Sequence, residues 1–116
     1  MLTIEYDPDN GMAVRDGECE QLAATYAYNA SIHKERLFSH STANIFYAVR
    51  LLVQQGQIDY HEIQFLYKGQ YLVLNEYGVP QNWPVGFLDF HGDYAQKLIL
   101  GGIAMRKAKR QTNANT

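Results

Sequence analysis

Short stretches in which apolar and polar residues alternate predict the strands of this chain. Residues 2–6 and 12–16 are two such stretches, and they flank residues 7–11, a run made of turn-forming residues. We therefore expect the chain to begin with a β-hairpin. A further short strand is expected over 35–39.

A second hairpin is predicted in the middle of the chain. Residues 63–67 and 71–75 alternate large apolar with polar side chains. Between them lies Gly69, which adopts at no steric cost the positive φ that a tight hairpin turn requires.

Apolar residues spaced three and four apart predict helices over 18–31, 42–55 and 93–109. The second is followed by Gly56, a residue typical of a helix C-terminus. The third contains two glycines at 101–102, which predict either a bend or the close approach of another backbone, such as that of a second copy of the chain.

These elements predict an α+β fold in which two antiparallel β-hairpins form a small sheet packed by two or three helices. Residues 1–105 are expected to form a single domain. Residues 106–116 are expected to form a basic, flexible C-terminal tail.

Charge is unevenly distributed along the 116 residues. The net charge is −2, but all 12 acidic residues precede residue 94, whereas four of the ten basic residues lie within 106–110. Residues 1–105 therefore carry six basic side chains against 12 acidic ones, a net charge of −6, which disfavours DNA binding.

The single cysteine, Cys19, excludes a disulfide within the chain and a multi-cysteine zinc site. The four histidines lack metal-ligand spacing, so no metal and no cofactor is expected. No apolar run approaches the length of a membrane span, and we expect a cytoplasmic protein without membrane contact.

Residues 40–89 resemble the C-terminal end of ABC-type AAA ATPases, a family that includes ATPases of bacterial and phage defence systems. The resemblance is carried by His40-Ser41, Tyr77-Gly78, Trp83-Pro84, Gly86-Phe87 and Asp89. In that family a strand ends in a Thr-His-Ser-type switch, and a hairpin and a Trp-Pro-x-Gly-Phe-type turn close the domain. The switch histidine senses the γ-phosphate, and the resemblance implies this role for His40.

The chain lacks the Gly-x-x-x-x-Gly-Lys-Ser/Thr run that holds a triphosphate and Mg²⁺, so it is not a complete ATPase. The resemblance then implies one of two things. The protein is an accessory or regulatory fragment that needs a partner's P-loop, or it is a small phage or mobile-element protein that acts on a host defence protein.

Aromatic and basic residues in the last third of the chain predict a ligand site. Trp83 and Phe87 can stack on a base, and Arg106 and Arg110 can bind a phosphate, contributed by a neighbouring protomer if the chain is a homo-oligomer. We therefore predict a nucleotide-type ligand and a homo-oligomer. The alternative is that these are core aromatics followed by a solvated tail.

Four further residues join this predicted site. Asp89 and His91 lie before the last predicted helix, where they either contact a ligand or cap the helix. Arg50 either binds an anion or pairs with Glu20 or Glu62. The complete predicted ligand-binding set is Trp83, Phe87, Asp89, His91, Arg106, Arg110, His40 and Arg50.

We predict from these patterns a non-catalytic binding protein with no catalytic residues. It would sequester a nucleotide-type signal or block a partner protein, in the manner of a phage anti-defence protein. The alternatives are the ATPase fragment described above and a small hydrolase that uses His40 or His91 with Asp89.

Overall fold

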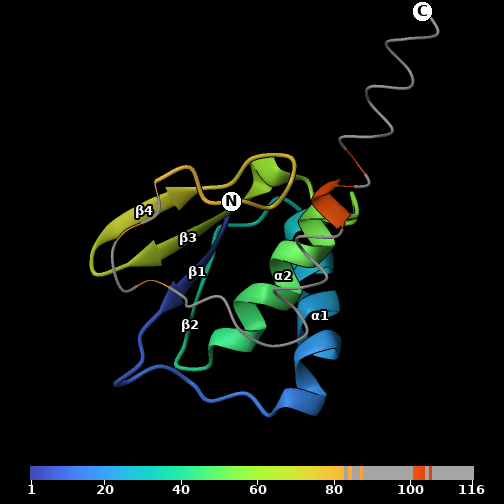
Figure 1. Ribbon diagram of the computed structural model, residues 1–116. Helices are drawn as coiled ribbons and strands as arrows, with labels where there is room; N and C mark the ends of the chain where they lie inside the picture. Colours follow the sequence, from blue (N-terminus) through green and yellow to red (C-terminus); the bar gives the residue numbers. More distant parts are fainter. Residues whose placement is uncertain (83, 85–86, 88–100, 104, 106–116) are drawn as a thin grey trace, which may run out of the picture.

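The computed structural model describes residues 1–82, 84, 87, 101–103 and 105, which form a four-stranded mixed sheet with helices packed on it (Figure 1). The strands are β1 (Leu2–Tyr6), β2 (Arg36–His40), β3 (Ile63–Tyr67) and β4 (Gln70–Val73). The α-helices are α1 (Cys19–Ser31) and α2 (Ala43–Gln54), and the two 3-10 turns are η1 (Asp16–Glu18) and η2 (Tyr60–Glu62).

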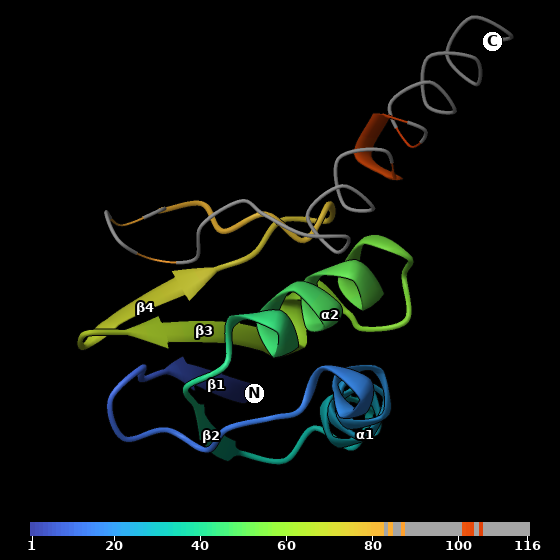
Figure 2. The same cartoon turned by 60° about the horizontal axis from the view of Figure 1, so that its bottom comes forward.

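The core lies between the two helices and one face of the sheet. Register pairing places Ile4, Phe38 and Phe65 on that face, in β1, β2 and β3. The ring of Tyr26 in α1 lies 4.9 Å from that of Phe38, and the ring of Phe46 in α2 lies 5.1 Å from that of Phe65. Both helices therefore cover the same face of the sheet, as Figure 2 shows from a second direction.

The strands lie in the order β2-β1-β3-β4, and two helical crossover connections join the parallel strands. The strand order determines whether each connection is right- or left-handed. β1 pairs in parallel with both β2 and β3, so the chain crosses from β1 to β2 through α1 and from β2 to β3 through α2. These crossovers run in opposite directions over one face. They consequently have opposite hands, and one is left-handed, whereas such connections are almost always right-handed.

On the other face of the sheet, the edge strands β2 and β4 expose large apolar side chains, whereas Thr3 in the central strand β1 is buried. Leu37, Tyr71 and Val73 on this face are 60%, 58% and 57% exposed. Between them lie polar side chains, and the amide of Gln64 donates a hydrogen bond to the hydroxyl of Thr3 over 3.0 Å. Sheets with parallel strands usually have both faces covered, so this exposure is unusual.

The first predicted hairpin is wrong. The Asp7 carboxylate accepts hydrogen bonds from the backbone N–H groups of Asp9 and Asn10, which bends the chain into a local turn. Met12 then bridges His40 in parallel, so the chain runs along β2 rather than back along β1. Gly11 is required at this point because a Cβ there would collide with the backbone of His40.

The second hairpin is confirmed as β3 and β4, which pair antiparallel. Its turn contains Lys68 and Gly69, with φ of 48° and 78°, as in a type I′ turn. The α+β class and the first two predicted helices are confirmed as well, and Gly56 has a φ of 78° directly beyond α2. The sheet, however, is mixed and contains one antiparallel pair.

Residues 101–103 and 105 are helical, and the rest of the predicted last helix and the predicted tail lie outside the described residues. A Cβ at Gly101 would collide with the side-chain oxygen of Gln54, at the end of α2. Gly101 therefore lies against the side chain of Gln54, whereas a Cβ at Gly102 would make only an ordinary contact with it. Within the described residues, no helix is both long enough and apolar enough to cross a membrane.

Candidate functional site

Five of the eight residues predicted to bind a ligand lie outside the described residues. The roles assigned to them stay predictions. They are Trp83, Asp89, His91, Arg106 and Arg110.

His40 is fully buried at the end of β2. Its Nδ1 lies 3.2 Å from the carbonyl oxygen of Met12, so Nδ1 carries the proton and donates it. Nε2 is then the acceptor for the hydroxyl of Tyr26. Burial lowers the pKa of His40 and raises that of Tyr26 to about 12, so both groups are neutral at pH 7.

This environment is that of a structural histidine. A γ-phosphate sensor or a general base must touch its substrate, whereas both ring nitrogens of His40 bond to protein atoms in the core.

Arg50 is also buried, at 2% exposure, in the middle of α2. Its Nε donates a 2.7 Å hydrogen bond to the carbonyl oxygen of Gly78, and its guanidinium lies 5.7 Å from the ring centroid of Tyr47. Burial lowers its pKa to about 10, which leaves it charged at neutral pH. Glu62, one of its predicted partners, pairs with His33 instead. Arg50 therefore ties the turn after β4 to α2.

Phe87 is 1% exposed and lies among the aromatic rings of the core. Its ring centroid is 5.3 Å from that of Tyr67 and 6.0 Å from that of Tyr6. Phe46 and Phe65 lie at 6.2 and 6.1 Å. A residue that stacks on a ligand needs an exposed ring face, so Phe87 has the position of a core aromatic.

The structure contains a cavity of about 320 Å³ between α1 and the segment that links α2 to β3. Small apolar side chains and a polar rim form its wall. The lining residues are Ala27, Ala30, Ser31, His33, Gln57, Ile58, Asp59 and Glu62. Its size falls at the lower end of the range of small-molecule sites, which typically combine an apolar wall with a few polar groups.

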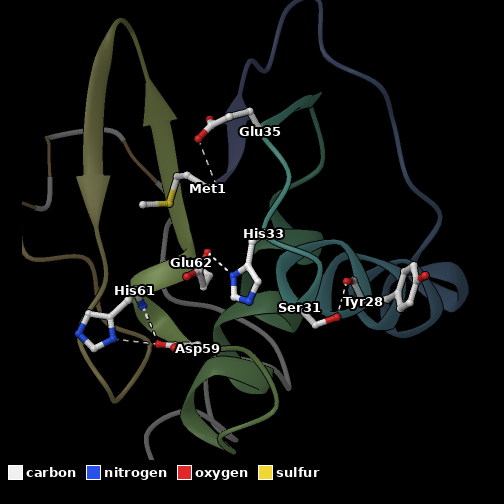
Figure 3. Close-up of polar contacts among 8 residues, drawn as sticks. All are labelled: Met1, Tyr28, Ser31, His33, Glu35, Asp59, His61 and Glu62. Atoms are coloured by element: carbon white, nitrogen blue, oxygen red, sulfur yellow. Dashed lines mark hydrogen bonds and ion pairs between the residues drawn. The ribbon is translucent and has the colours of Figure 1, made fainter.

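A contact between the His33 imidazole and the Glu62 carboxylate joins the two sides of this cavity (Figure 3). The His33 Nδ1 and Glu62 Oε2 atoms are 3.2 Å apart. His33 has a φ of 56°, and its N–H donates to the carbonyl of Ala30, so it ends α1 in the left-handed conformation often found after a helix. The helix end thus places the imidazole at the cavity.

A second histidine–carboxylate pair lies on the same segment. Asp59 Oδ1 accepts hydrogen bonds from the backbone N–H of His61 at 3.0 Å and from its Nδ1 at 2.9 Å. These hydrogen bonds hold the pKa of Asp59 below its ordinary value. Figure 3 shows the His61 ring turned away from His33.

Sequence reasoning missed this site. The sequence feature that marks the site is the polar segment from Asp59 to Glu62, which follows soon after Gly56. Nothing local connects that run to His33, because the contact depends on the packing of α1 beside the start of β3. In the described part of the chain no three His, Cys, Asp or Glu residues are grouped to hold a metal ion.

A second, more open hollow of about 390 Å³ lies beside the first half of α1. It contains one ionisable side chain, Glu18, beside residues such as Met12, Val14 and Leu22. It therefore offers less specific chemistry than the cavity at His33.

Comparisons of the chain with protein-family models, with curated proteins and with solved structures found no match.

Proposed function

We propose that this protein is a non-catalytic binding protein that holds a small ligand in the cavity beside His33. The observation that carries the proposal is the cavity itself, with an apolar wall from α1 and a rim that carries both carboxylates and imidazole. Within this proposal the ligand is a signal of a host defence system, as the resemblance of residues 40–89 implies.

The geometry of the lining favours binding over catalysis. Ser31 contributes the hydroxyl group of the cavity lining. Its Oγ donates a 2.6 Å hydrogen bond to the carbonyl oxygen of Tyr28. His33, the nearest imidazole in sequence, faces Glu62 instead. Because the Ser31 hydroxyl donates to Tyr28 and not to an imidazole, it lacks the hydrogen bond to a base that activates a nucleophile.

A cavity-filling substitution tests the proposal. Ala27→Leu adds three carbons to a side chain that lines the cavity, whereas Ala24→Leu makes the same change at an exposed position of α1. We would measure saturation-transfer NMR with n-pentylamine, pentanol, pentanoate and adenosine monophosphate.

At least one compound should bind the wild type and Ala24→Leu, lose binding in Ala27→Leu, and be recovered chemically unchanged. Conversion of the bound compound would contradict the proposal. So would the absence of binding to the wild type, or equal binding to Ala27→Leu.

A further inference from the structure

The formal charges in the cavity wall are those of two carboxylates. Asp59 and Glu62 line the cavity, and its lining includes neither lysine nor arginine. The two carboxylates place negative charge at the rim of the cavity. Such a rim repels phosphate and carboxylate ligands and attracts cations.

Each carboxylate uses one of its two oxygens in the contacts described above. Glu62 contacts His33 through Oε2, and Asp59 contacts His61 through Oδ1. In the described part of the chain, the second oxygens, Oε1 and Oδ2, remain as acceptors. An ammonium group has three N–H donors and no acceptor, so it complements this rim.

The rest of the wall is apolar and small. Ala27, Ala30 and Ile58 contribute methyl and aliphatic groups beside the rim. A volume of about 320 Å³ holds roughly ten water-sized groups, enough for a short hydrocarbon chain. A ligand that fits has a charged amine at one end and a few apolar carbons at the other.

We infer that the cavity binds a small organic cation, a primary amine with a short aliphatic chain, whose ammonium group lies between Asp59 and Glu62. This inference rests on the proposed function, and it excludes nucleotides from this cavity.

Three ligands of equal chain length test the charge preference. The backbone amide resonances of Ser31 and Gln57 would be followed by ¹⁵N NMR during titration with n-pentylamine, pentanol and pentanoate. The amine should bind about tenfold more tightly than the alcohol, because hydrogen bonds to a charged group are stronger than neutral ones. Pentanoate should bind most weakly.

Two matched carboxylate variants test whether the preference for the amine over the alcohol arises in the cavity. Glu62→Gln should weaken amine binding about tenfold and pentanol binding much less, because the alcohol carries no charge. Glu35→Gln is the control, because Glu35 is exposed, pairs with the amino group of Met1 over 3.3 Å and does not line the cavity.

Equal binding of amine and alcohol, stronger binding of pentanoate, or an unchanged amine affinity in Glu62→Gln would overturn the inference while leaving the proposed function intact. If none of the three compounds shifts these resonances, the inference fails, and the proposed function fails with it unless adenosine monophosphate binds the wild type and not Ala27→Leu.

Discussion

His40 lies between two hydrogen-bond partners in the core, where burial favours its neutral form. Met12 offers only a carbonyl oxygen, and Tyr26 donates its hydroxyl proton to the other ring nitrogen. Protonation of His40 would replace the acceptor at Nε2 with a second donor in the core. The folded protein therefore resists protonation at this residue.

This resistance predicts a loss of stability in acid. Burial lowers the pKa of His40 in the folded protein, so the unfolded chain takes up the proton at higher pH. The free energy of unfolding should fall as the pH drops below the ordinary value of 6.5, and this contribution should level off below the folded-state pKa. Urea unfolding at a series of pH values between about 4.5 and 7.5 measures it.

The variant His61→Gln is the control for this prediction, because the side chain of His61 is 68% exposed in the folded protein. It should keep the acid-induced loss, whereas His40→Gln should start less stable and lose less on acidification. If His40→Gln and the wild type lose the same free energy between these pH values, the neutral core role of His40 is contradicted.

The turn after β4 is fastened to α2 at Gly78. Its carbonyl accepts the hydrogen bond from Arg50, and its φ of 73° lies in the region that favours glycine. A Cβ at this position would collide with the backbone carbonyl oxygen of Arg50. Glycine here allows two elements to approach more closely than any side chain permits.

Gly78→Ala should therefore lower the free energy of unfolding by roughly 2–4 kcal/mol, since both the strained φ and the collision must be relieved. Gly17→Ala is the matched change, because a Cβ there meets nothing within 4 Å. It should shift stability by less than about 1 kcal/mol. Chemical denaturation of the two variants provides the comparison, and similar effects would contradict the close contact.

Elements that depend on neighbours in sequence were predictable. The spacing of apolar residues in α2, the Gly56 that follows it and the Lys68-Gly69 turn are all local features. The parallel pairing of β1 with β2 and β3 was not predictable, because it depends on segments more than 30 residues apart. The turn at Asp7 is a local feature. The direction of the chain after this turn is determined by the bridge between Met12 and β2, which is not local.

At the scale of the whole molecule, packing both helices on one face has two consequences. It leaves apolar side chains of the edge strands exposed on the other face of the sheet in the described residues, at Leu37 and Tyr71. It also brings the end of α1 beside the segment before β3, which forms the cavity. The same packing explains why the sequence did not reveal the cavity, while His40 and Arg50, which it did single out, are core residues.

The location of ligand binding tests the proposed function most directly. Trp83 is the single tryptophan of the chain, so its indole N–H gives one resonance that reports on the nucleotide site predicted from the sequence. We would record ¹⁵N NMR spectra during titration with n-pentylamine. We expect shifts at Ser31, Gln57 and Glu62, with the Trp83 indole unchanged. Unmoved cavity resonances would contradict this location, and a shifted Trp83 indole in their place would move the amine site to the last third of the chain.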